Sequence, residues 1–167
     1  MTLGMYNNAS FNGYIDEFRI SNNARYTAAF TPTTVPFTND DYTVLLMHMN
    51  GTNATTFFED DNGAVGRTPK AITASGNAQI STTQSKFGGT SAYFDGTGDY
   101  LSIGSDAFAI VPWTGDFTWE AWVYLANTTA DMALFEGKGN NNLFIRRTSA
   151  NKLGIGRQLV AFDNTST

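Results

Sequence analysis

The chain has 167 residues, no cysteine and a net charge of −5, with 15% charged and 14% aromatic side chains. This length suits one domain with a sizeable core, and the aromatic content argues against disorder, because disordered chains lack the apolar mass that offsets chain entropy. The acidic balance disfavours nucleic acid and anionic membranes as partners. The lack of cysteine excludes disulfides and thiolate catalysis, and no apolar run approaches the roughly 18 residues of a membrane span, so no membrane insertion is expected.

Residues 11–21 predict a β-strand that contains a β-bulge. Side chains alternate between the two faces of a regular strand, so Ile15 and Phe18 cannot share a face unless one residue is extra. A bulge near Asp16 and Glu17 resolves this conflict and would aim a carboxylate inward. The partner of that carboxylate is either a cation or, as we favour, one of two arginines, Arg19 or Arg25.

A linker follows the N-terminal strand. Residues 21–27 predict one short helical turn, and the two prolines within 30–37 favour an extended chain. The polar run at 38–41 ends this linker. We therefore place a boundary there, between residues 1–37 and residues 42–167.

The remainder of the chain predicts strands separated by turns. The segment 117–125 alternates strictly, with Trp119 and Val123 on one face and Trp122 and Tyr124 on the other. The strand spacing of roughly 8–12 residues is typical of a β-sandwich, and no segment has helical periodicity. The predicted strands are 43–49, 91–94, 100–104, 117–125, 132–136, 143–147 and 153–157.

Four segments carry a family resemblance: LLMHMNGT at 45–52, QSKFGGTSAYFDG at 84–96, FTWEAWV at 117–123 and GYIDEFRIS at 13–21. They resemble the opening strand, the second hairpin, the strand after it and the last strand of the laminin-G and pentraxin-like branch of the concanavalin A-like lectin/glucanase superfamily. The similar modules are those of phage tail and virion proteins and of bacterial surface proteins. The resemblance implies an all-β fold, an antiparallel β-sandwich of the jelly-roll type.

The order of these segments departs from the family pattern. The segment that closes the family's domain stands first here, and the family's central strands are missing between residue 167 and residue 1 when the chain is read circularly. We favour a junction of two tandem modules, in which 1–37 supplies the closing strands of one and 42–167 the opening and middle strands of the next. Alternatively, a permuted domain closes on itself, or 1–37 completes a neighbouring copy by strand exchange.

The resemblance also implies binding loops. Pentraxins bind calcium at a rim made by two loops, which correspond to residues 4–8 and 137–142. These loops carry amides, which hold calcium poorly but suit sugar hydroxyls; the alternative is that asparagine and glycine simply form turns. A tryptophan beside Pro112 would stack on a sugar ring or cover the edge of the core. The predicted ligand-binding residues are Asn7, Asn8, Asn140, Asn141 and Trp113.

Acidic residues in two loops and in the N-terminal strand are the candidate ligands of a structural Ca²⁺ ion. Neither loop has the spacing of an EF-hand, and the single histidine, His48, excludes a histidine-based metal site or a Ser/His/Asp triad. Glu120 has no carboxylate two residues away, as glycoside hydrolysis by paired carboxylates on one strand would need, so no catalysis is predicted. The candidate metal ligands are Asp60, Asp61, Asp95, Asp99 and Asp16.

These observations predict a non-catalytic recognition or adhesion module directed at a surface glycan or host receptor. Its expected place is a virion surface, as a tail, fibre or capsid decoration, or an extracellular or cell surface of bacteria. The alternative is a structural subunit that joins copies of itself, or tandem modules, into a fibre or shell by strand exchange. A glucanase is the least favoured function.

Overall fold

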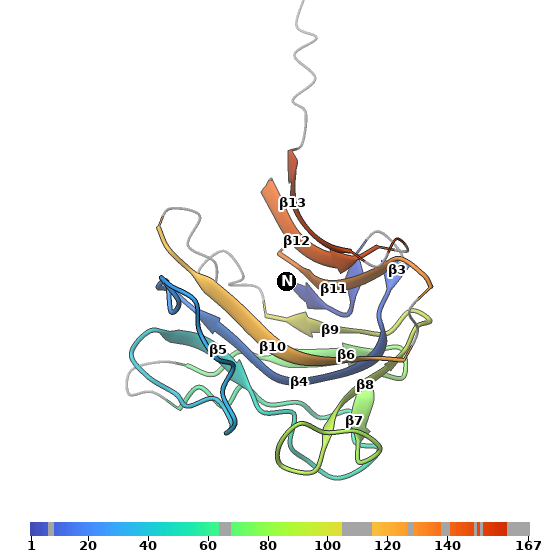
Figure 1. Ribbon diagram of the computed structural model, residues 1–167. Helices are drawn as coiled ribbons and strands as arrows, with labels where there is room; N and C mark the ends of the chain where they lie inside the picture. Colours follow the sequence, from blue (N-terminus) through green and yellow to red (C-terminus); the bar gives the residue numbers. More distant parts are fainter. Residues whose placement is uncertain are drawn as a thin grey trace, which may run out of the picture.

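The computed structural model describes residues 1–6, 9–63, 68–104, 115–126, 129–137, 141–148, 150 and 152–159, and these residues form an all-β structure of antiparallel sheets without helices (Figure 1). One sheet has the order β13-β12-β11-β1-β9-β6, and a second has the order β10-β4-β8-β7 with β5 also paired to β4. A short ribbon joins β2 and β3. The strands are β1 (Thr2–Leu3), β2 (Met5–Tyr6), β3 (Ala9–Ser10), β4 (Asn12–Ser21), β5 (Thr43–Met47), β6 (Ile72–Ser75), β7 (Gln79–Ser81), β8 (Ser91–Asp95), β9 (Tyr100–Ile103), β10 (Thr118–Leu125), β11 (Met132–Glu136), β12 (Asn141–Arg147) and β13 (Leu153–Leu159).

The N-terminal strand β4 is the central strand of its sheet. It pairs with β10 along one side, and on the other side its first half pairs with β8 and its second half with β5. The strands on the two sides of residues 38–41, β4 and β5, therefore lie next to each other in one sheet of the same chain. The N-terminal segment forms an inner strand of this sheet rather than an edge.

The predicted β-bulge is present in β4. Between Arg19 and Asp16 the strand advances three residues, while the partner strand advances two, from Glu120 to Trp122. The extra residue is Glu17, which has a positive φ of 53°. Because of this insertion Ile15 and Phe18 both face the core, as the sequence required.

The inner faces of the two sheets enclose an apolar core. The alternation predicted for 117–125 is confirmed, because Trp119 packs against the core residue Phe135 while Glu120 meets Arg19 and Tyr124 meets Tyr14 on the opposite face of the sheet. The largest fully buried side chains are Phe11, Phe94, Phe135, Leu3, Ile15, Ile20, Leu45, Leu46, Met47, Ile80, Leu101 and Ile103.

The two strands around the Asp/Gly turn at 95–99 do not form the expected hairpin. β8 belongs to the sheet of β4, whereas β9 lies between β1 and β6 in the other sheet. The turn therefore connects the two sheets. Buried Asp99 holds it, because its carboxylate accepts hydrogen bonds from the amides of Asn77 and Asp95, both at 2.8 Å.

The helical turn expected at 21–27 is also absent. The chain bends there because the side chain of Arg25 turns back to the Ser21 hydroxyl and across to the carboxylate of Asp40. Phe37 then returns to β4, where its ring lies 4.4 Å from the Arg19 guanidinium carbon. The segment 22–42 is thus attached to the outer side of the sheet. No helix suited to crossing a membrane occurs in the described residues.

Candidate functional site

The outer face of the β4 sheet carries a groove of about 170 Å³ above the bulge. We call it the Asp16 groove, and its lining combines aromatic rings with a carboxylate, an amide, an ammonium group and hydroxyls. β4 and β10 supply one wall, and the loop before β8 supplies the other. The lining residues are Tyr14, Asp16, Gln84, Ser85, Lys86, Ser91, Trp122, Val123 and Tyr124.

The carboxylate of Asp16 is the most unusual group in this groove. The residue is only 3% exposed, and its Oδ2 accepts hydrogen bonds from the backbone amides of Lys86 and Phe87 at 2.6 and 3.0 Å. Its Oδ1 is buried without a hydrogen-bond partner among the described residues. Burial raises the pKa of this carboxyl, while the backbone amides of Phe87, Lys86 and Glu17 act in the opposite direction. A buried acceptor left without a donor costs free energy in the unliganded protein.

Aromatic rings from three neighbouring strands lie beside this carboxylate. Tyr14 of β4 contacts Tyr93 of β8 and Tyr124 of β10, with ring centroids 5.0 and 5.8 Å apart. Trp122 lies directly across from Asp16 in the sheet register. Tyr124 is 52% exposed, so a large ring face is available to a ligand.

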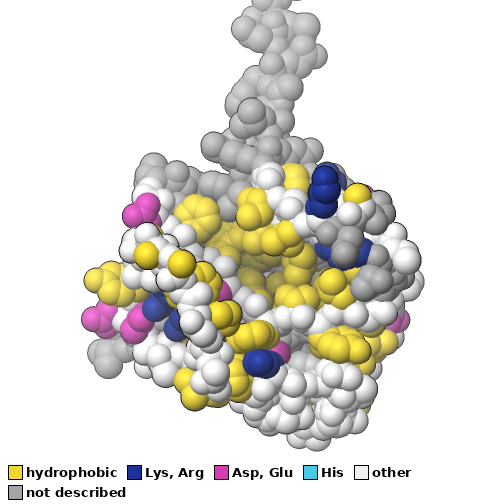
Figure 2. Space-filling model, in the orientation of Figure 1, with side chains coloured by type: hydrophobic (Ala, Val, Ile, Leu, Met, Phe, Trp, Pro, Cys, Tyr) yellow, Lys and Arg dark blue, Asp and Glu magenta, His cyan; other side chains and the backbone are white. Residues whose placement is uncertain are grey.

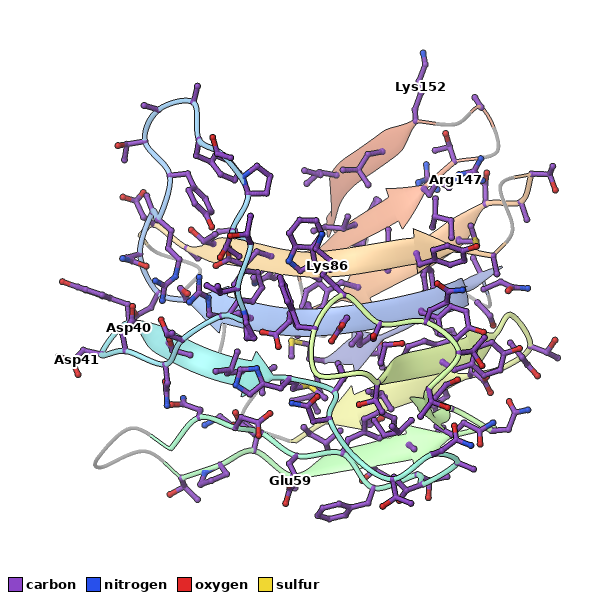
Figure 3. The ribbon with its side chains drawn as sticks, turned by 60° about the horizontal axis from the view of Figure 1, so that its bottom comes forward. Asp40, Asp41, Glu59, Lys86, Arg147 and Lys152 are labelled. Carbon is purple, nitrogen blue, oxygen red and sulfur yellow. The ribbon has the colours of Figure 1, made fainter. Side chains whose placement is uncertain are left out.

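Lys86 crosses the groove from its loop. In Figure 3 it extends over β4 toward β10, and its Nζ lies 4.1 Å from the centre of the Trp122 ring. The neighbouring Phe87 meets the same ring edge-to-face at 6.2 Å. The loop is therefore held on the outer face by two contacts to Trp122 and by the Asp16 carboxylate.

The other carboxylate of the bulge points to a different partner. Oε1 of Glu17 lies 2.8 Å from Nδ1 of His48, and Oε2 accepts a hydrogen bond from the amide of Phe37. The predicted salt bridge from this acidic pair to Arg19 or Arg25 is therefore wrong. Both arginines instead approach Glu120, Arg19 at 2.7 Å and Arg25 at 3.6 Å.

Glu120 is enclosed by this network. Besides the two arginines, it accepts a hydrogen bond from the hydroxyl of Tyr26 at 2.5 Å. Burial and this hydrogen bond raise the pKa of the Tyr26 hydroxyl. The carboxylate thus anchors the segment after β4 to β10.

A second, larger hollow of about 550 Å³ lies beside β10, and we call it the edge slot. Figure 2 shows hydrophobic side chains gathered in a hollow on this face. The lining is mostly apolar and comes from β1, β4, β10, β11, β12, β13 and the segment 26–37. Its residues are Leu3, Ile15, Phe18, Tyr26, Phe30, Pro32, Thr33, Phe37, Thr118, Trp119, Glu120, Ala121, Trp122, Val123, Leu134, Phe135, Ile145 and Leu153.

Most of the sequence-predicted sugar-binding residues fall outside the described part of the chain. This applies to Asn7, Asn8, Asn140 and Trp113. For Asn141 the structure gives only the backbone, which pairs with Leu159 at the start of β12. The loop-based binding site therefore stays a prediction.

The predicted calcium ligands are distributed over separate turns, where their oxygens bind backbone amides. Asp60 accepts from the amides of Leu46, Asn62 and Lys70. Asp61 accepts from that of His48. Within the described residues no group of three or more His, Asp or Glu side chains could hold a metal ion, and the calcium site stays a prediction.

The other two loop acids, Asp95 and Asp99, stabilise the turn between β8 and β9. Asp95 accepts from the Thr97 amide at 2.7 Å and from the Asn77 side chain at 3.1 Å. Asp16 lies apart from this turn, in the Asp16 groove.

Sequence reasoning named Asp16 but missed the aromatic rings beside it. Alternation already placed Trp122 and Tyr124 on one face of 117–125, and this was the available signal. Nothing local showed that Tyr14 and Lys86 would join them, because both contacts depend on strand pairing and loop packing over long sequence distances.

No family model, curated protein or solved structure matched this chain.

Proposed function

We propose that this chain is a non-catalytic recognition module that binds a surface glycan through the Asp16 groove. We further propose that its sheets form a jelly-roll β-sandwich of the laminin-G and pentraxin-like type, displayed on a virion or on a bacterial cell surface. The observation that carries the functional proposal is the partnerless Oδ1 of Asp16, buried beside a row of aromatic rings.

The chemistry of the groove suits a sugar. A sugar ring presents apolar C–H faces and polar hydroxyl edges, and tyrosine and tryptophan rings offer an apolar face together with a polar group. A hydroxyl that donates to a carboxylate forms a charge-assisted hydrogen bond, which is stronger than a neutral one. Gln84 and Lys86 add donors at the rim of the groove, and Gln84 adds an acceptor.

The enclosure of Glu120 favours binding over hydrolysis. A general acid or a nucleophile must reach the substrate, whereas both oxygens of this carboxylate already contact Arg19 or Tyr26. The arrangement is that of a structural ion pair at the side of β10.

The test is a glycan array probed with the native chain and with Tyr124→Ala. Loss of one stacking ring should weaken binding about tenfold, equivalent to roughly 1.4 kcal/mol. Tyr42→Ala is the matched control, because Tyr42 is 53% exposed and lies outside the groove. Its glycan binding should equal that of the native chain.

The loop prediction is tested in the same array with Asn8→Ala and Asn141→Ala. If these variants lose binding while Tyr124→Ala keeps it, the function stands but the site lies in the loops. If the native chain binds no glycan, the proposed function is wrong.

A structural role is the second candidate, because the edge slot is a large apolar hollow beside β10, which among the described strands pairs along one edge only. A large exposed apolar surface of this kind is typical of a site where another polypeptide binds.

A further inference from the structure

The edge slot runs along β10 and extends into the space between the two sheets, where Leu3 and Phe135 of the other sheet line it. Its lining contains Trp119, Ala121 and Val123 from the inner face of the strand, and Glu120 and Trp122 from the outer face. A hollow that touches both faces of one strand borders the free edge of that strand. An extended polypeptide in this position can hydrogen-bond to β10 and also pack against both sides of the slot.

Within the described residues, the free edge of β10 carries few of the features that usually block the addition of a strand. Within the described residues β10 pairs with β4 alone. Exposed edges are usually blunted by lysine, proline, bulges or an inward charge, but the eight residues of β10 include neither lysine nor proline. Its one charge, on Glu120, is paired with Arg19.

The far side of the slot is also apolar and exposed. Leu153 of β13 lines the slot and is 67% exposed, and Ile155 of the same strand is exposed as well. β13 pairs with β12 alone among the described strands, so both strands that border the opening have an unpaired edge. The occupant must therefore supply main-chain hydrogen bonds together with apolar side chains.

We propose that a second copy of this chain fills the edge slot, with β10 of each copy pairing antiparallel to β10 of the other. This inference goes beyond glycan binding, although Trp122 and Val123 of β10 line both the edge slot and the Asp16 groove. A second copy fits because β10 carries the alternating apolar side chains that the slot requires. Each chain has a net charge of −5, yet the slot brings together few charges, so two acidic chains can meet there without strong repulsion.

Two-fold symmetry restricts the register of the paired strands. A pairing centred on Ala121 places this small side chain at the axis and Trp119 of one copy opposite Val123 of the other, a favourable aromatic and β-branched pair. A pairing centred on Glu120 would oppose two like charges. A pairing centred on Trp122 would oppose two indole rings on the outer face, where Lys86 and Phe87 already pack.

The register is tested with Ala121→Cys, because the native chain contains no cysteine. Opposite residues of an antiparallel pair have Cα atoms about 4.5–5.5 Å apart, within the range that a disulfide spans. Mild oxidation should therefore give a covalent dimer in high yield. Thr73→Cys is the control and should stay uncrosslinked, because Thr73 lies on β6, an edge strand of the six-stranded sheet at the opposite end from β13.

The interface is tested without oxidation by measuring the mass of the native chain in solution over a range of concentrations. We expect a dimer whose dissociation constant rises at least tenfold in Leu153→Lys. Phe57→Lys is the matched control, since Phe57 is also 67% exposed but lies outside the slot. Thermal unfolding of each variant separates loss of pairing from loss of fold.

Three results would overturn the proposal. One is a native chain that stays monomeric at every soluble concentration. Another is a dimer in which Ala121→Cys crosslinks no better than Thr73→Cys. The third is a dimer that Leu153→Lys and Phe57→Lys weaken equally.

Discussion

Single charged side chains hold the segment after β4 against the sheet. Arg25 forms hydrogen bonds to both oxygens of Asp40 at 2.8 Å, and Arg19 donates to the carbonyl oxygen of Thr38. These bonds replace the helical turn that the sequence suggested. The hydrogen bond from Arg25 holds the pKa of the Asp40 carboxyl well below its ordinary value of 3.8.

Replacing Asp40 with Asn should lower the free energy of unfolding near neutral pH by less than about 1 kcal/mol, because the ion pair is partly exposed. A carboxyl whose pKa is depressed by folding contributes its full stability above its unfolded pKa, and the contribution is lost as the pH falls below it. The difference in the free energy of unfolding between the native chain and Asp40→Asn should therefore stay constant near neutral pH and shrink as the pH falls below about 4. Urea unfolding at several pH values measures it, and a gap that widens in acid would contradict the assignment.

At the scale of elements, β4 brings the main features of the site together. Its bulge places Asp16 and Glu17 on the outer side while Ile15 and Phe18 remain in the core. Near the start of the same strand, Gly13 lies opposite Leu125 of β10 with a φ of 151°, a conformation that favours glycine. A side chain at this position would overlap the carbonyl oxygen of Tyr124.

Gly13→Ala should therefore separate β10 from β4 and lower the free energy of unfolding by about 2–4 kcal/mol. The same change should also lower the affinity of the Asp16 groove for its ligand, since β4 and β10 together form one wall of the groove. Gly63→Ala is the control, because a methyl group there meets nothing within 4 Å. Chemical denaturation compares the two, and equal stabilities would show that β10 adjusts without cost.

At the scale of the whole molecule, β4 from the N-terminal segment pairs with three strands that come from the remainder of the chain. β4 pairs with β10 on one side and with β5 and β8 on the other, and these three strands are far apart in the sequence (Figure 1). Without β4 these strands would have no common neighbour, and the core side chains that it carries would be missing. Strand exchange between copies would place the β4 of another chain at this same position, so the intrachain pairing defines the geometry that such an exchange would reproduce.

Deleting residues 1–37 should therefore abolish cooperative unfolding of the remaining chain, because the deletion removes an inner strand rather than an edge. Circular dichroism and thermal scans provide the measurement. Adding a synthetic peptide of residues 9–22 should restore part of the transition. A truncated chain that still unfolds cooperatively, with unchanged stability, would show that β4 is dispensable.

The sequence alone was sufficient for features that depend on neighbouring residues. Alternation along 117–125 determined which side chains face the core. Ile15 and Phe18 are three residues apart, so they can share one face of a strand only if the strand contains a bulge. Composition and turn residues likewise determined the all-β class. These rules act within one strand, so no partner is needed to read them.

Tertiary structure alone decided which strands became neighbours. The separation of β8 from β9 into different sheets, the central place of β4 and the meeting of Asp16 with Trp122 and the Lys86 loop all join residues far apart in the chain. Strand pairing depends on how whole faces bury their apolar surface, and local side-chain patterns do not encode that choice. For the same reason, the Asp16 groove and the edge slot became visible only once the sheets were assembled.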